Sequence, residues 1–192
     1  MDCIKINEIK EALALCLDEE RYEHSLGTAE CASELAERYG ENADKAYLAG
    51  LLHDCAKCET KESLEKILHT EREFLSLTDC EFLAPKTFHA PAGVIVARDK
   101  FKINDSEILS AIRWHTIGKK DMSLLEKIIY LADKIETRTR PADFREPIAK
   151  FLQEENGLDK AILESYKNTI KSLTDRNLPI CYQTIDVYNS LL

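Results

Sequence analysis

Histidine and aspartate residues are the first feature of the sequence that suggests chemistry. The chain has five histidines, and four of them are expected at helix ends or on a long helix: His24, His53, His89 and His115. Asp54 follows His53 directly, and Asp133 lies within the apolar stretch EKIIYLADKIE. A carboxylate on a buried face needs a partner, because an unpaired buried charge is strongly destabilising. A metal ion is one such partner, and nitrogen and oxygen ligands suit Zn, Mn, Fe or Co.

Periodic apolar residues indicate that helices hold these side chains. Apolar positions recur at steps of three and four from Asn7 to about Tyr39, and Gly40 fits a helix stop. Asn42 is a suitable N-cap for a third helix that runs into His53-Asp54. The sequence therefore predicts the His53-Asp54 pair near a helix C-terminus.

The other two histidines are also expected at helix boundaries. Pro91 can occupy the first turn of a helix, which places His89 at the start of that helix. Asp105 or Asn104 caps the next periodic segment, and Gly118 ends it shortly after His115. Side chains from different helices can converge at such ends.

The second half of the chain continues the helical pattern. Ser123 and Glu126 form a capping box before the apolar run that carries Asp133. The run TRTRPADFREP breaks the periodicity around Pro141, and further helices are expected over residues 61–69, 148–153, 161–173 and 182–192. The sequence shows no internal repeat and no alternating strand pattern. The predicted fold class is therefore all-α, as one domain over residues 1–192.

Composition excludes several classes of function. Lys and Arg number 26 against 35 Asp and Glu, a formal charge of −9, which disfavours a general nucleic-acid binder. There is no signal-peptide pattern and no apolar run near the roughly 18 residues of a membrane span. We expect a soluble, cytoplasmic protein that binds neither membrane nor nucleic acid. No glycine-rich phosphate loop is present in the sequence.

Seven cysteines in such a chain are expected to be free thiols in a reducing compartment. Cys55-x-x-Cys58 has the spacing of a redox pair or of half a zinc site. However, it follows a helical run, and no second such motif exists in the sequence. We interpret both as buried or half-buried thiols.

Five blocks in order resemble the HD-domain metal-dependent phosphohydrolase superfamily, and in particular its YqeK branch. They are RYEHSLGTAECASELA, GLLHDCAK, FHAPAGVIVA, IRWHTIG and LADKIE. The resemblance covers about Glu19 to Glu136 and is looser beyond Arg140. It implies an HD-domain helical bundle with a metal-site core over about residues 19–136 and C-terminal helices over 141–192.

The resemblance also implies a binuclear metal site. One metal is assigned to four residues, His24, His53, Asp54 and Asp133. Asp54 would bridge to a second metal held by His89 and His115. Iron is the implied metal, with Mn, Co or Zn as alternatives, and a homodimer is implied as well. The implied activity is symmetrical cleavage of diadenosine tetraphosphate (Ap4A) into two ADP by attack of a metal-bridging hydroxide.

Basic residues near the ligand blocks are candidates to bind the phosphates. Lys57 follows Asp54 by three residues, about one helical turn, and resembles the lysine of the HDxxK form. We expect Asp54 and Lys57 to be catalytic and Lys57 to contact phosphate as a point charge. Further candidates for substrate binding are Arg21, Lys119, Lys134, Arg138 and Arg140. His69 matches no block and is expected at the surface.

Two alternatives share the same fold. HD folds act on many phosphoesters, so the substrate could instead be a nucleoside mono- or triphosphate or a cyclic dinucleotide. The chain could also be a non-enzymatic metal or nucleotide sensor, although all six ligand positions of a water-activating site are retained. ADP as the only product from Ap4A would discriminate in favour of the first function.

Overall fold

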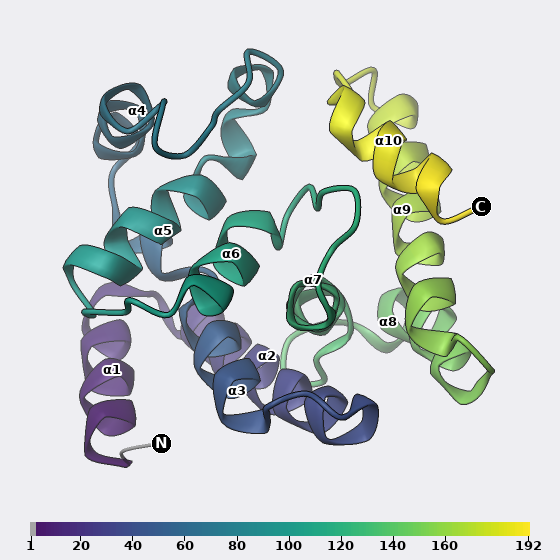
Figure 1. Ribbon diagram of the computed structural model, residues 1–192, viewed down its shortest axis with the longest axis horizontal. Helices are drawn as coiled ribbons and strands as arrows, with labels where there is room; N and C mark the ends of the chain where they lie inside the picture. The colour runs from purple at the N-terminus through teal and green to yellow at the C-terminus, as the bar shows by residue number, and fades with distance from the viewer. Residues whose placement is uncertain (1–2) are drawn as a thin grey trace.

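The periodic segments form ten α-helices and four short 3-10 helices within residues 3–192, the part of the chain that this computed structural model describes (Figure 1). Side chains are described from residue 5 onward. No strand occurs in this range, so the prediction of an all-α fold is confirmed. The α-helices are α1 (Cys3–Cys16), α2 (Glu19–Tyr39), α3 (Ala43–Leu52), α4 (Lys61–Thr70), α5 (His89–Asp99), α6 (Ser106–Trp114), α7 (Leu124–Ile135), α8 (Ala142–Ala149), α9 (Gly157–Asp175) and α10 (Tyr182–Ser190). The 3-10 helices are η1 (Cys55–Cys58), η2 (Glu81–Leu83), η3 (Pro85–Thr87) and η4 (Lys150–Gln153).

Local signals set the ends of the helices. The Asn42 side chain accepts a hydrogen bond from the Lys45 amide at 3.0 Å and caps α3. Gly40 ends α2 with a φ of 78°, a left-handed conformation that favours glycine. Ser123 and Glu126 form the predicted capping box at the start of α7.

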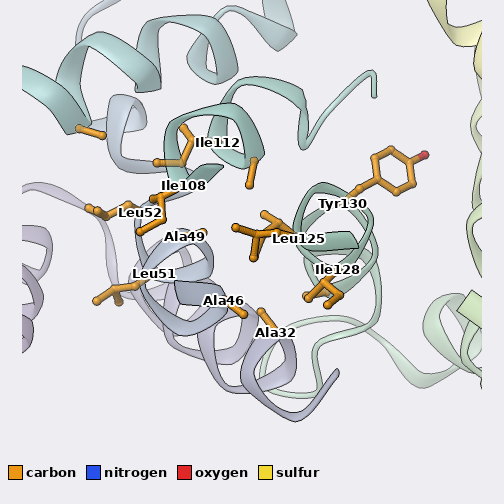
Figure 2. Packing of buried hydrophobic residues seen from close by; sticks show 14 of the residues in the cluster. Ala32, Ala46, Ala49, Leu51, Leu52, Ile108, Ile112, Leu125, Ile128 and Tyr130 are labelled. Atoms are coloured by element: carbon orange, nitrogen blue, oxygen red, sulfur yellow. The ribbon is translucent and has the colours of Figure 1, made fainter. Parts of the chain in front are cut away.

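Helix α7 lies at the centre of the molecule. It packs against α2, α3, α6, α8 and α9 (Figure 1). Figure 2 shows Leu125 and Ile128 of α7 directed toward α2, α3 and α6, whereas Tyr130 points away from them. The Tyr130 ring stacks on Tyr166 of α9, with centroids 5.0 Å apart. Helix α7 is therefore buried on both sides, and each large aliphatic side chain buried there contributes roughly 2 kcal/mol.

Helix α8 lies in a segment where the sequence predicted a break in the pattern. Pro141 immediately precedes α8, and Pro147 lies inside it. Proline is well suited to a helix start, but Pro147 has no N–H for the carbonyl four residues earlier. The helix is correspondingly short and passes into η4, while Ile148 is fully buried and anchors it to the core. No helix in the described residues is long and apolar enough to span a membrane.

A disulfide joins Cys16, at the end of α1, to Cys58, at the end of η1, with a Cα–Cα distance of 5.3 Å. The expectation that all cysteines are free thiols is therefore wrong for this pair. Cys55 does not pair with Cys58, which is bonded to Cys16; its thiol is buried and donates to the Gly93 carbonyl oxygen at 3.6 Å. Burial raises the pKa of the Cys55 thiol. The free cysteines among the described side chains are Cys31, Cys55, Cys80 and Cys181.

Candidate metal centre

The end of α3 brings the His53-Asp54 pair against α2. The backbone leaves the helical conformation at Asp54, where φ is −105° and ψ is 13°. A Cβ atom at Gly50 would lie 2.9 Å from the Thr28 carbonyl oxygen, so glycine allows α3 to approach α2 this closely. The two helices thus place His53 beside His24.

The first cluster consists of His24, His53, Asp54 and Asp133, all buried. The Nε2 atoms of His24 and His53 are 3.3 Å apart. His24 Nε2 is 2.9 Å from Asp133 Oδ1, and His53 Nε2 is 3.3 Å from Asp54 Oδ2. Four ligand-type side chains from α2, α7 and the end of α3 therefore surround one small volume.

The second cluster consists of Asp54, His89 and His115. Asp54 Oδ1 is 3.3 Å from His89 Nε2 and 3.5 Å from His115 Nε2. The two histidine Nε2 atoms are 3.2 Å apart. His89 begins α5 and His115 follows α6, as the sequence predicted. The two oxygens of Asp54 therefore face different clusters, and the chain brings all six predicted ligand residues together.

Hydrogen bonds at Nδ1 fix which ring nitrogen faces the clusters. His53 Nδ1 lies 2.6 Å from the Gly50 carbonyl oxygen and His115 Nδ1 lies 2.8 Å from that of Ile112. A carbonyl oxygen only accepts, so both Nδ1 atoms carry the proton and both Nε2 atoms present a lone pair in the neutral ring. Neutral Nε2 is the form that binds a metal.

Asp54 shows whether the residues of the two clusters could hold a metal ion. Its Oδ1 atom is buried and accepts no hydrogen bond from the described residues, although buried polar atoms almost always have a partner. The atoms nearest to it include the Nε2 atoms of His89 and His115. The Nε2 lone pair of His115 faces this carboxylate oxygen and repels it, and a cation between the two atoms would remove that repulsion. The residues present therefore fit divalent metal ions with nitrogen and oxygen ligands.

The pKa directions of four candidate ligands agree with ligand character. His24 is the exception: burial alone would lower its pKa, but its hydrogen bonds to Asp133 and Glu136 raise it. Burial lowers the pKa of His53, and it lowers that of His89 to about 3, so both rings stay neutral. Burial alone would raise the pKa of Asp54, but His53 and the other histidines around it hold that pKa well below its usual value. The same balance, with Lys134 as the largest opposing group, lowers the pKa of Asp133. Ionised carboxylates and neutral imidazoles are the protonation states that metals require.

Glu136 is a residue of the site for which the sequence suggested no role. Its side chain is fully buried, and Oε1 accepts a hydrogen bond from His24 Nδ1 at 3.1 Å. Burial opposes its ionisation, but the bonds from His24 and Thr139 lower the pKa of Glu136 to about 2. A Cβ at Gly27 would lie 2.3 Å from Glu136 Oε2, so only glycine leaves room there. Glu136 orients the His24 ring, and its position one helical turn after Asp133 was the available signal.

Three of the predicted phosphate-binding cations lie at the clusters. Lys57 Nζ is 2.6 Å from Asp54 Oδ2, and Lys134 Nζ is 2.5 Å from Asp133 Oδ2. Arg140 Nη2 is 2.7 Å from Asp133 Oδ1. Their charges therefore surround the carboxylates of the first cluster.

The other three predicted cations are paired with carboxylates outside the two clusters. The ion pairs are Arg21 with Asp18, Lys119 with Glu126, and Arg138 with both Glu23 and Glu30. Their role in substrate binding stays a prediction. His69 is exposed, as expected, and its ring stacks on Phe82 with centroids 5.3 Å apart.

Comparison with known families identifies the class. A family model described as HD domain matches residues 21–138. The chain therefore belongs to the HD-domain family of metal-dependent hydrolases, as its sequence blocks suggested. The match contains all six residues of the two clusters.

Individual proteins of known name or structure are similar to almost the whole chain. A protein of Halalkalibacterium halodurans named "Bis(5'-nucleosyl)-tetraphosphatase, symmetrical" is 41% identical over 92% of this chain and 91% of its own length. A protein of Bacillus subtilis with the same name is 38% identical over 95% of this chain and 97% of its own. A crystal structure from Clostridium acetobutylicum, described as a predicted HD superfamily hydrolase involved in NAD metabolism, superposes with a TM-score of 0.88. It is 39% identical and covers 97% of this chain and 96% of its own.

Proposed function

We propose that this chain hydrolyses Ap4A symmetrically to two ADP. The observation that carries the proposal is the Asp54 carboxylate, whose two oxygens face separate sets of histidines. This arrangement occurs in a chain that is similar, over more than nine-tenths of its length, to proteins named for this reaction. A carboxylate shared in this way would hold two metal ions close together, as two-metal phosphohydrolysis requires.

In this proposal His24, His53 and Asp133 would hold one divalent cation, His89 and His115 would hold another, and Asp54 would be a ligand of both. Two cations bound there would lower the pKa of a water and neutralise charge on the phosphoryl oxygens. His89 and His115 contribute Nε2 to the second position, and the Nδ1 bond of His115 keeps its ring oriented. Glu136 does the same for His24 in the first position.

Basic side chains near the clusters would neutralise the negative charge of the substrate's phosphates. Lys57, Lys134 and Arg140 lie on the ligand carboxylates, where the tetraphosphate would approach. The oxygen of water adds to the second phosphorus from one end, the bond to the bridging oxygen of the next phosphate breaks, and ADP leaves. ADP is a good leaving group, so stabilising the developing charge matters more than a strong general acid. No serine or cysteine nucleophile is required.

Iron is the metal we propose, with Mn, Co or Zn as alternatives, because histidine and carboxylate ligands accept all of them. The resemblance to the YqeK branch supports iron. A homodimer, a cytoplasmic location and the lack of nucleic-acid binding stay predictions.

Product analysis tests the proposal. The metal-loaded protein is incubated with Ap4A, and the nucleotides are resolved by anion exchange while bound metal is quantified on the same sample. ADP as the sole product with about two metals per chain is the expected result. AMP together with ATP would mean asymmetrical cleavage, and bound metal without turnover would favour another phosphoester substrate or a sensor.

A further inference from the structure

A cavity of about 320 Å³ is lined by residues that flank two histidines of the second cluster in the sequence. Its walls are residues 83–87 before α5, residues 116 and 117 after α6, and parts of α9, α10 and their connection. Figure 1 places α9 and α10 on one side of the molecule, across from α5 and α6. Thr116 follows His115 directly, so their Cα atoms are about 3.8 Å apart. Thr87 precedes His89 by two residues, so two wall segments of the cavity are continuous in sequence with histidines of the second cluster.

The lining of the cavity suits a nucleoside. Ile117, Leu173 and Leu178 provide apolar surface, and the hydroxyls of Thr116 and Thr169 provide a few polar groups. Small-molecule sites have this composition and span roughly 300–1,000 Å³. The volume is at the lower end of that range, which suits one base with its sugar better than a whole dinucleotide.

The edge of the cavity suits an anionic ligand with an apolar part. Leu83 is 63% exposed and Leu178 is 38% exposed, so apolar surface remains uncovered there. Lys86 and Arg176 also line the cavity and are exposed. Within residues 5–192 their charged groups form no ion pair. In a chain of net charge −9, two such cations beside an apolar surface attract a ligand that combines a ring system with phosphate.

We propose that this cavity binds one nucleoside of the dinucleoside polyphosphate, so that the phosphates of the same half extend to the second cluster. The inference rests on the proposed function and adds the position of the base. It makes Leu173 and Lys86 determinants of nucleotide affinity, although neither residue belongs to the metal centre or is adjacent in sequence to one of its ligands.

Filling the cavity tests the inference. In the Leu173→Trp variant, the larger side chain occupies space that the base would use. Ile170→Trp is the matched control, because Ile170 lies on the same helix, is also half-buried and does not line this cavity. Calorimetry on the metal-loaded proteins measures the binding of ADP and of inorganic pyrophosphate, which share a diphosphate but differ by the nucleoside.

The inference predicts that Leu173→Trp weakens ADP binding by about tenfold or more, roughly 1.4 kcal/mol, and leaves pyrophosphate binding within about twofold. Ile170→Trp should change neither, and Lys86→Ala should weaken ADP binding by a smaller factor. Unchanged ADP binding in Leu173→Trp would overturn the inference, as would an equal loss for ADP and pyrophosphate. If the wild type does not cleave Ap4A but the variants change ADP binding in this pattern, the proposed function fails and the nucleoside site stands.

Discussion

At the scale of single residues, Asp54 links the two halves of the site. Its Oδ1 atom faces His89 and His115, while Oδ2 faces His53 and Lys57. No donor in the described residues satisfies Oδ1, although the group is buried. A carboxylate in this position is costly for folding alone. Under the proposed function two cations would share it and offset that cost.

Replacing Asp54 with Ala should therefore abolish turnover and reduce bound metal from about two ions per chain to one or fewer. The reason is that the substitution removes a ligand from both positions at once. Metal analysis and Ap4A turnover on the same purified sample measure both effects. Full activity, or two metals still bound, would contradict a shared carboxylate.

Lys57 should affect catalysis without affecting the metals. Its ammonium lies beside Asp54, and its side chain is 31% exposed, so it can also reach a bound phosphate. Lys57→Ala should lower kcat/KM for Ap4A by about tenfold to a hundredfold, as expected for a lost hydrogen bond to a charged group. Lys61→Ala serves as the control, because Lys61 is 71% exposed and pairs with Glu65 on α4.

A loss of bound metal in Lys57→Ala would mean that this lysine positions the metal ligands and does not bind the substrate. Equal losses of activity in both lysine variants would show that the effect does not depend on position.

The six candidate ligand residues were named from the resemblance of five sequence blocks to the HD-domain superfamily, and their role as ligands stays a prediction. Local signals placed three of them at helix boundaries. His53, His89 and His115 lie at helix boundaries that Asn42, Pro91 and Gly118 reveal. Glu136 was not found, because its contact with His24 joins residues 112 positions apart and depends on how α2 packs on α7. The pairing of Arg138 with acidic residues of α2 was hidden for the same reason.

At the scale of helices, local chemistry predicted most boundaries. Caps such as Asn42, the left-handed Gly40 and the Ser123 capping box all lie where the sequence indicated. Helix α8 was not predicted, because Pro141 and Pro147 indicate a break in the helical pattern. The burial of Ile148, which anchors the helix, depends on tertiary packing. The disulfide was missed because Cys16 and Cys58 meet only once α1 packs near η1.

The disulfide should stabilise the fold, and with it the segment that carries Lys57. It closes a loop with a sequence separation of 42, for which chain entropy gives about 4 kcal/mol. Cys58→Ser should therefore lower the free energy of unfolding by about 2–4 kcal/mol in urea denaturation, whereas Cys80→Ser should change it little.

Mass spectrometry of the denatured, unreduced protein after alkylation is the direct check on the disulfide. Cys16 and Cys58 should remain unmodified. Alkylation of both would contradict the bond.

At the scale of the whole molecule, burial of the histidines makes the metal-free fold sensitive to acid. The pKa of His89 falls from 6.5 to about 3 on burial, so between these values the unfolded chain binds more protons than the folded one. The stability that His89 contributes is therefore fully present above about pH 6.5 and declines as the pH falls toward 3. His53 acts in the same direction.

Denaturant unfolding of metal-free protein at pH 7 and pH 5 measures this dependence. The loss between the two should be smaller by about 2 kcal/mol in His89→Gln than in the wild type. Equal losses in the two proteins would mean that His89 is not held neutral by the fold.

Under the proposed function, the two clusters that share Asp54 direct water to one phosphorus of a symmetrical substrate. The most direct test is hydrolysis of Ap4A by the metal-loaded protein in water enriched in oxygen-18, followed by mass spectrometry of the products. ADP should be the only product, and half of the ADP molecules should carry one heavy oxygen, on the β-phosphate. AMP and ATP as products, or heavy oxygen on the α-phosphate, would contradict the proposed function.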